Sequence, residues 1–144
     1  MRVVNRIKNN FKMDVNQSIF INLPVIEDIR GNLAFAQNDN LPFDLKRIYY
    51  LFDIPSTASR GGHSHKAQSE ILIALSGSFE VTIMDGTNEK TVLLNKPAVG
   101  FLIPPGLWRE LQNFSSGAVC LVLASDVFDE SDYIRDFKEF LKLK

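Results

Sequence analysis

The chain has little of what several classes of protein require. Its 144 residues include one cysteine, Cys120, which lies in an apolar run and cannot form a disulfide within the chain. The formal net charge is −1 and there is no basic tract, so we expect no nucleic-acid partner. No hydrophobic run is long enough to span a membrane, and the basic stretch 1–14 lacks the apolar centre of a signal peptide. These absences favour a cytoplasmic protein without a membrane partner.

What the sequence does contain is a series of short apolar runs separated by turn residues. A chain of 144 residues is long enough for one domain with a hydrophobic core. Residues 79–84 alternate apolar and polar side chains and end at Asp85-Gly86, which is a strong hairpin signal. Similar runs cover residues 19–23, 31–36, 46–52, 70–75, 90–94, 99–103, 108–114 and 118–123. Many short strands at regular spacing predict an all-β barrel or sandwich.

The C-terminal residues change to a helical pattern. Apolar residues recur at helical spacing from Tyr133 to Leu141, with acidic residues before them and lysines at the end. We therefore predict a short C-terminal α-helix within 129–144 that packs on the barrel and carries no chemistry. The predicted single domain, 1–144, then consists of an N-terminal extension (1–18), a β-barrel (19–128) and this helical segment.

Both histidines of the chain, His63 and His65, stand two residues apart in the segment 60–66. Residues two apart on a β-strand point to the same face, so both imidazoles would project into one space. Histidine changes charge near neutral pH and is also a common metal ligand. The pair is therefore a candidate for proton transfer or for metal binding.

The spacing of further residues resembles the two motifs of the cupin barrels. The matching residues are, in chain order, His63, His65, Glu70, Gly77, Gly100, Pro104, Gly106 and Asn113. In metal-binding cupins the second motif supplies one more histidine, and here that position holds Arg109. A guanidinium cannot bind a metal and would repel a divalent cation. We expect a cupin-type antiparallel β-barrel (jelly roll) with a metal-free pocket; a metal-dependent enzyme that uses His63, His65 and Glu70 is the alternative.

A closer resemblance covers most of the chain after its first two dozen residues. It is carried by the ordered segments 30–33, 41–50, 60–66, 97–100, 108–110, 123–126 and 132–135. Together they look like the WxcM-like sugar ketoisomerases, small cupins that interconvert dTDP-4-keto-6-deoxyglucose and its 3-keto isomers. The resemblance implies a metal-free homodimer, often with exchanged N-terminal strands. The sequence departs from the family at Gly62, where we expect an aromatic residue, and at Glu70, where we expect a non-ligand.

The implied reaction matches the residues available. Moving a ketone from C-4 to C-3 requires a proton to leave C-3 and another to reach C-4, through an enediol or enediolate. We assign His63 and His65 as the catalytic pair, with His65 as the base, and expect Arg109 and Tyr49 to stabilise the oxyanion. The further candidate contacts for the dTDP-sugar are Arg30, Arg47, Arg60, Lys66 and Trp108. No glycine-rich dinucleotide-binding fingerprint is present, so we expect no cofactor.

Other interpretations remain open at this point. The chain could be a non-catalytic or regulatory cupin that binds a nucleotide sugar, and such a protein would have no turnover to lose when its histidines are replaced. Single residues also have plain structural readings. Lys66 alternates to the face opposite the histidines, Arg30 stands at a turn where it could only be solvated, and Trp108 could belong to the core.

Overall fold

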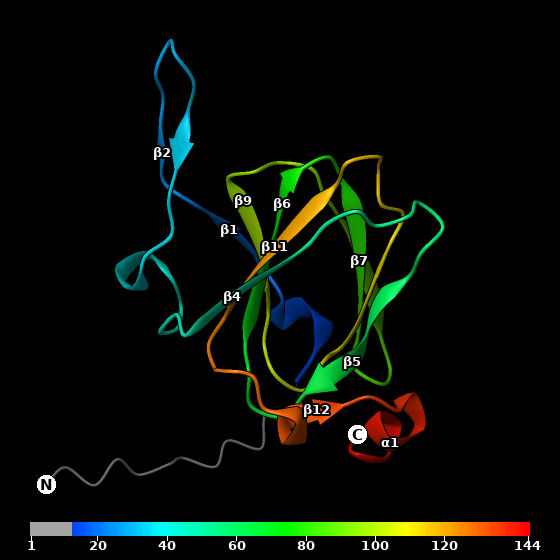
Figure 1. The fold of residues 1–144 in the computed structure, drawn as a ribbon. Coiled ribbons are helices and arrows are strands. Elements are labelled where there is room, and N and C mark those ends of the chain that lie inside the picture. Colours follow the sequence, from blue (N-terminus) through cyan, green and yellow to red (C-terminus); the bar gives the residue numbers. More distant parts are fainter. Residues whose placement is uncertain (1–12) are drawn as a thin grey trace, which may run out of the picture.

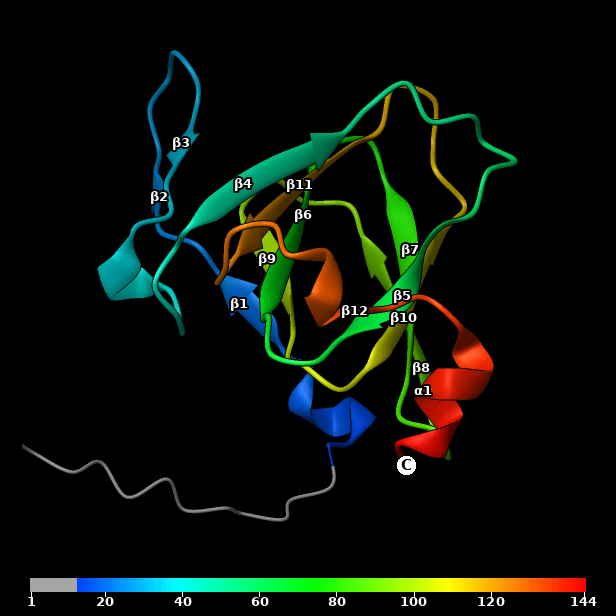
Figure 2. The same ribbon diagram turned by 60° about the horizontal axis from the view of Figure 1, so that its bottom comes forward.

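Two five-stranded antiparallel sheets make up most of the computed structural model, which describes residues 13–144 (Figures 1 and 2). The first sheet has the order β1 (Phe20–Asn22), β9 (Val99–Ile103), β6 (Glu70–Ser76), β11 (Val119–Ala124), β4 (Arg47–Leu51). The second has the order β12 (Tyr133–Ile134), β5 (Arg60–His65), β10 (Trp108–Gln112), β7 (Phe79–Met84), β8 (Glu89–Leu94).

The hydrophobic core lies between the two sheets. Phe79, Val81 and Ile83, at alternate positions of β7, are fully buried, as are Phe101 and Ile103 on β9. Alternation in a strand sends every second side chain to the same face, so the pattern read from residues 79–84 was correct. The prediction of an all-β barrel with one short C-terminal helix is confirmed.

The C-terminal segment is only partly helical. It forms a 3-10 turn, η3 (Glu130–Asp132), then β12, and only then the helix α1 (Phe137–Lys142). The assignment of residues before 137 to a helical segment was therefore wrong. The physical reason is that β5 would otherwise leave an open edge, which β12 covers by pairing Tyr133 with His65 and Ile134 with Ser64. The helix begins where the Asp136 side chain accepts the N–H of Glu139.

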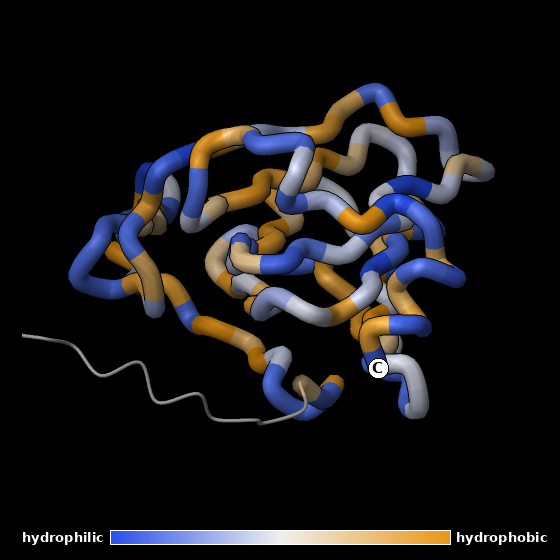
Figure 3. Tube along the Cα trace, turned by 90° about the horizontal axis from the view of Figure 1, so that it is seen from below, coloured by the Kyte–Doolittle hydropathy of each residue, from blue (hydrophilic) through white to orange (hydrophobic). Residues whose placement is uncertain are grey.

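The segment between β1 and β4 lies outside the barrel. A 3-10 turn, η1 (Val15–Gln17), precedes β1, and in Figure 3 the chain that follows the grey trace passes through hydrophilic (blue) and hydrophobic (orange) stretches in turn. The predicted strand over 31–36 is reduced to β3 (Leu33–Ala34), which pairs with β2 (Val25–Ile26) in a hairpin that projects from the barrel (Figure 1). A further 3-10 turn, η2 (Asn38–Asn40), leads towards β4. Residues 1–12 lie outside the described residues. They make up most of the predicted extension 1–18 and of the basic stretch 1–14 that was considered as a signal peptide.

Among residues 13–144, no helix is both long and apolar enough to cross a membrane.

Two glycines with a left-handed backbone provide a test of this packing. Gly77 (φ 66°) joins β6 to β7, and a Cβ there would lie 2.3 Å from the Ser115 hydroxyl and 3.0 Å from the Ala118 backbone. Gly117 (φ 71°) has open space around its Cβ position. We predict that Gly117→Ala costs about 1–2 kcal/mol, the price of the backbone conformation alone, and that Gly77→Ala costs clearly more. Urea unfolding measures both, and equal losses would contradict the packing at this turn.

Candidate active site

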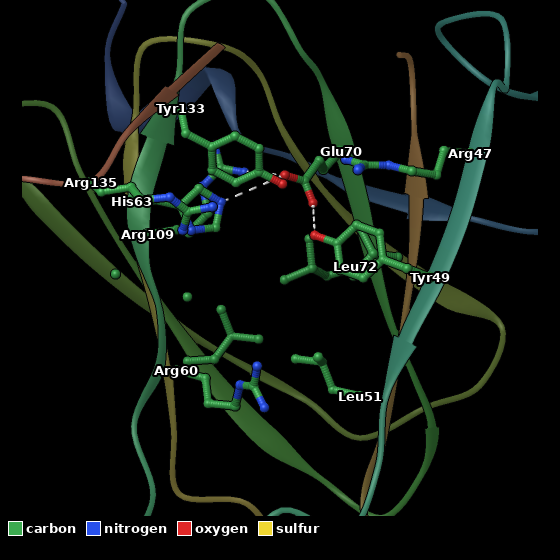
Figure 4. Close-up of a pocket in the computed structure, with 14 residues that line it drawn as sticks. Arg47, Tyr49, Leu51, Arg60, His63, Glu70, Leu72, Arg109, Tyr133 and Arg135 are labelled. Atoms are coloured by element: carbon green, nitrogen blue, oxygen red, sulfur yellow. Dashed lines mark hydrogen bonds and ion pairs between the residues drawn. The ribbon is translucent and has the colours of Figure 1, made fainter. Parts of the chain in front are cut away.

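A cavity of about 280 Å³ opens between β4 of the first sheet and β5 and β12 of the second (Figure 4). Glycines at positions 61 and 62 of β5 leave this part of the wall without side chains, and Leu51, Leu72, Leu111 and Val122 supply its apolar surface. The polar side chains that line it are Arg47, Tyr49, Arg60, His63, Glu70, Arg109, Tyr133 and Arg135. The cavity therefore combines cations, a buried acid, phenols and one imidazole.

The two histidines lie on one face of β5, as the spacing predicted. Their ring centroids are 4.7 Å apart and their Nε2 atoms are 3.1 Å apart. His63 lines the cavity with 12% of its side chain exposed, whereas His65 is fully buried behind it. The sequence favoured His65 as the base, but His63 is the histidine whose ring reaches the cavity.

Glu70 is the residue that joins the parts of the site. It is the first residue of β6 and is buried. Its Oε1 accepts a hydrogen bond from Arg109 Nη1 at 3.0 Å and lies 2.5 Å from His65 Nε2. Its Oε2 accepts a short hydrogen bond from the Tyr49 hydroxyl. One carboxylate thus connects β4, β5 and β10.

The charges around Glu70 decide how the site is protonated. Burial alone would raise the pKa of Glu70, but the neighbouring imidazoles of His63 and His65 and the charge of Arg109 outweigh it and hold this pKa well below its usual range. Burial, followed by the charges of Arg109 and His65, lowers the pKa of His63 below 6.5, although Glu70 opposes this shift. His63 is therefore an unprotonated base at neutral pH.

Tyr49 lies across the cavity from His63, with Glu70 between them (Figure 4). Burial raises the pKa of the Tyr49 hydroxyl, and the neighbouring charge of Glu70 raises it further. The phenol therefore keeps its proton in the resting site. The cavity presents an unprotonated imidazole on one wall and a protonated hydroxyl on the other.

Two residues of the C-terminal segment complete the site, and sequence reasoning assigned them no role. The Asp132 carboxylate lies 3.0 Å from His65 Nδ1 and accepts the N–H of Ala67 at 2.7 Å. The Tyr133 ring packs on both histidines, with centroid distances of 5.0 Å to His63 and 4.4 Å to His65. The segment 132–135 contributed to the family resemblance, which was the only available signal; reading it as part of a packing helix hid its place at the cavity.

A divalent metal does not fit this donor set. Within residues 13–144, His63, His65 and Glu70 offer three ligand atoms that lie within 4.8 Å of one another. The Glu70 oxygen nearest to the histidines is, however, already hydrogen-bonded to the guanidinium of Arg109. A permanent positive charge at that distance would repel a second cation. The Arg109 guanidinium thus occupies the place next to Glu70 that a metal ion would need.

The structure brings together four of the predicted substrate contacts. They are Arg47, Tyr49, Arg60 and Arg109, all of which line the cavity. To this group it adds Arg135, whose guanidinium lies 4.2 Å from the centroid of the Tyr133 ring.

The other three predicted contacts lie elsewhere in the chain. Arg30 is at the end of the projecting hairpin, 86% exposed and paired with Asp28 at 2.7 Å. Lys66 follows β5 on the opposite face, and its Nζ donates to the Ser131 carbonyl at 2.8 Å. Trp108 is buried against α1, with its ring centroid 5.7 Å from that of Phe140. The contacts of Lys66 and Trp108 favour structural roles for both residues.

Comparison with known proteins relates this site to a family. The family model described as WxcM-like, C-terminal matches residues 16–144. A TDP-4-oxo-6-deoxy-alpha-D-glucose-3,4-oxoisomerase from Aneurinibacillus thermoaerophilus is 45% identical over 123 residues, which cover 85% of this chain and 88% of the relative.

Solved structures give the same relationship. The WlaRB TDP-quinovose 3,4-ketoisomerase from Campylobacter jejuni is 43% identical with a TM-score of 0.84, covering 89% of this chain and 99% of the other. A histidine-to-asparagine mutant of the 3,4-ketoisomerase QdtA from Thermoanaerobacterium thermosaccharolyticum, in complex with TDP-4-keto-6-deoxyglucose, is 38% identical with a TM-score of 0.87, covering 91% and 95%. From the family match and these identities, the chain belongs to the WxcM-like family, together with these 3,4-ketoisomerases.

Proposed function

We propose that this chain is a TDP-sugar 3,4-ketoisomerase that converts TDP-4-keto-6-deoxyglucose to a 3-keto-6-deoxyhexose without a metal or other cofactor. The observation that carries the proposal is the position of His63 on the cavity wall, with its Nε2 atom 3.1 Å from that of His65, which in turn lies 2.5 Å from Glu70 Oε1. The substrate class comes from relatives that are 38–45% identical over most of their length.

The first step is removal of the C-3 proton by His63. The electrons of the C-3–H bond form the C-3=C-4 double bond, and the carbonyl oxygen at C-4 becomes an oxyanion. Arg109 supplies the positive charge that this oxyanion needs in a buried site. Its Nε is buried and has no hydrogen-bond partner among residues 13–144, so it remains available as a donor.

The second step is delivery of a proton to C-4, which we assign to Tyr49. Because Tyr49 and His63 lie on opposite walls, a ring held between them loses a proton from one face and gains one on the other (Figure 4). In the chair form of a gluco sugar, H-3 and H-4 lie on opposite faces. The proposed product therefore has the gluco configuration at C-4, which is also that of quinovose, the sugar named for the Campylobacter jejuni relative.

The nucleotide extends beyond the cavity. A volume of about 280 Å³ lies just below the usual range for ligand pockets, roughly 300–1,000 Å³, and suits the sugar ring alone. Arg60 and Arg135 are exposed residues of the lining and so lie where the cavity opens, with Arg47 on the β4 side. Guanidinium groups bind phosphate oxygens in pairs, which suits the diphosphate. The 3-keto product offers a carbonyl for amination, so we propose that it supplies deoxyamino-sugar synthesis for lipopolysaccharide or S-layer glycans.

The active protein is proposed to be a homodimer. The edge strand β4 exposes Ile48 and Tyr50 on its outer face, and the projecting hairpin exposes Ile26 and Ile29. Exposed apolar residues on an unpaired edge favour association with a second copy. Arg30, at the end of this hairpin, would then contact substrate only in the cavity of the partner subunit.

The direct test of function is incubation with TDP-4-keto-6-deoxyglucose in heavy water containing EDTA, followed by NMR. We expect a 3-keto product with deuterium at C-4, and the same product formed in ordinary water should show a large coupling between H-4 and H-5. His63→Asn should lower turnover by about a hundredfold or more. Lys138→Gln, at an exposed position of α1, is the control and should retain turnover. A protein that binds the sugar but produces no product would instead be the non-catalytic cupin, and turnover that EDTA abolishes would indicate a metal enzyme.

The pH dependence follows from the lowered pKa of His63. The base acts in its unprotonated form, so kcat/KM falls as the pH drops through the pKa of His63 in the free enzyme. Since burial holds that pKa below 6.5, the acid limb of the profile should lie below pH 6.5. An acid limb above pH 6.5 would mean that the essential base is another group.

The dimer is tested by light scattering at micromolar concentration. Tyr50→Glu adds a charge to the outer face of β4 and should shift the mass from dimer to monomer. Leu141→Glu, at an exposed position of α1 far from the hairpin in Figure 1, is the control and should leave the dimer intact. A monomeric wild-type protein would refute the proposal.

A further inference from the structure

A continuous row of polar groups connects the two walls of the cavity. His63 Nε2 lies 3.1 Å from His65 Nε2, and His65 Nε2 lies 2.5 Å from Glu70 Oε1. Glu70 Oε2 accepts the hydrogen bond from the Tyr49 hydroxyl. Each contact is within hydrogen-bond distance, so a proton can pass from His63 to Tyr49 through the protein, without entering the cavity.

We propose that Glu70 is a proton-relay residue that joins His63 to Tyr49, so that the proton taken at C-3 replaces, through the protein, the proton that Tyr49 gives to C-4. This inference rests on the proposed ketoisomerase function and adds a role for a residue that does not itself contact the reacting carbons.

The protons balance along this route. His63 Nε2 receives the proton from C-3, which leaves an enediolate with the negative charge on O-4. His63 then passes its proton to His65, and His65 passes its own to Glu70 Oε1. The carboxyl group turns about its Cγ–Cδ bond and gives a proton to the Tyr49 oxygen as Tyr49 gives its own proton to C-4. In the same step the hydroxyl proton on O-3 passes to the neighbouring O-4 and the C-3 carbonyl forms, which restores the resting enzyme.

Asp132 gives the row its direction. Its carboxylate accepts a hydrogen bond from His65 Nδ1 at 3.0 Å, and it is fixed by the N–H of Ala67. With Nδ1–H held in this way, the Nε2 atom of His65 is the one that exchanges protons with His63 and Glu70. Asp132 is thus a positioning residue for the relay.

The relay also makes the order of the two steps physically reasonable. A tyrosinate beside an ionised carboxylate in a buried site is strongly disfavoured, so Tyr49 cannot give up its proton while Glu70 stays charged. Glu70 loses its charge only after His65 has passed on a proton. Tyr49 can therefore act as an acid only after His63 and His65 have passed on the proton that came from C-3.

The experiment compares two rates in heavy water: deuterium exchange at C-3 of recovered substrate, and formation of product. In Glu70→Gln, which is similar in shape but cannot carry the proton, we expect C-3 exchange to stay within about tenfold of wild type while product formation falls about a hundredfold or more. Tyr49→Phe should show the same separation, and His63→Asn should lose both rates.

Three outcomes would overturn the relay. They are unchanged product formation in Glu70→Gln, an equal loss of exchange and product formation in a folded Glu70→Gln protein, and a linear dependence of wild-type kcat on the fraction of heavy water. The last measurement needs no variant, and we expect a curved dependence because more than one proton is transferred. A wild-type protein with neither exchange nor product would instead refute the proposed function.

Discussion

The buried carboxylate of Glu70 is the interaction on which the rest of the site depends. A carboxylate removed from water is stable only when its partners replace the lost hydration. Here those partners come from three different strands: Tyr49 on β4, His65 on β5 and Arg109 on β10. The same contacts that satisfy the charge therefore fix the positions of His65, which supports the proposed base, and of Tyr49, the proposed acid. A cavity that holds these groups at fixed distances requires both sheets of the barrel.

In the proposed mechanism, Arg109 is the residue that favours proton transfer over metal chemistry in this barrel. A divalent ion at this point would bind the nitrogen lone pairs of His63 and His65 and remove them as bases. The guanidinium supplies positive charge next to Glu70 and leaves the lone pair of His63 free. Burial lowers the pKa of His63, and the charge of Arg109 lowers it further. In the proposed mechanism Arg109 is thus the oxyanion donor and also helps to keep the base unprotonated.

The sequence predicted the barrel and the centre of the site because both depend on local patterns. Strand alternation identified β7, and the spacing of His63 and His65 put both rings on one face. The parts that it missed depend on contacts between distant segments. Tyr133 lies against the histidines because β12 pairs with the otherwise open edge of β5. This pairing outweighs the helical spacing of the residues before 137. Trp108 is buried because α1 packs on its ring. No local pattern in the sequence indicates that the turn with Arg30 projects from the barrel.

The central claim is that the sugar ring lies between His63 and Tyr49, and a crystal structure of His63→Asn bound to TDP-4-keto-6-deoxyglucose would test it most directly. The account predicts that C-3 faces residue 63 and that the Tyr49 oxygen lies roughly 3–3.5 Å from C-4 on the opposite face of the ring. A complex in which C-3 and C-4 both face the histidines, with Tyr49 remote from the sugar, would contradict it.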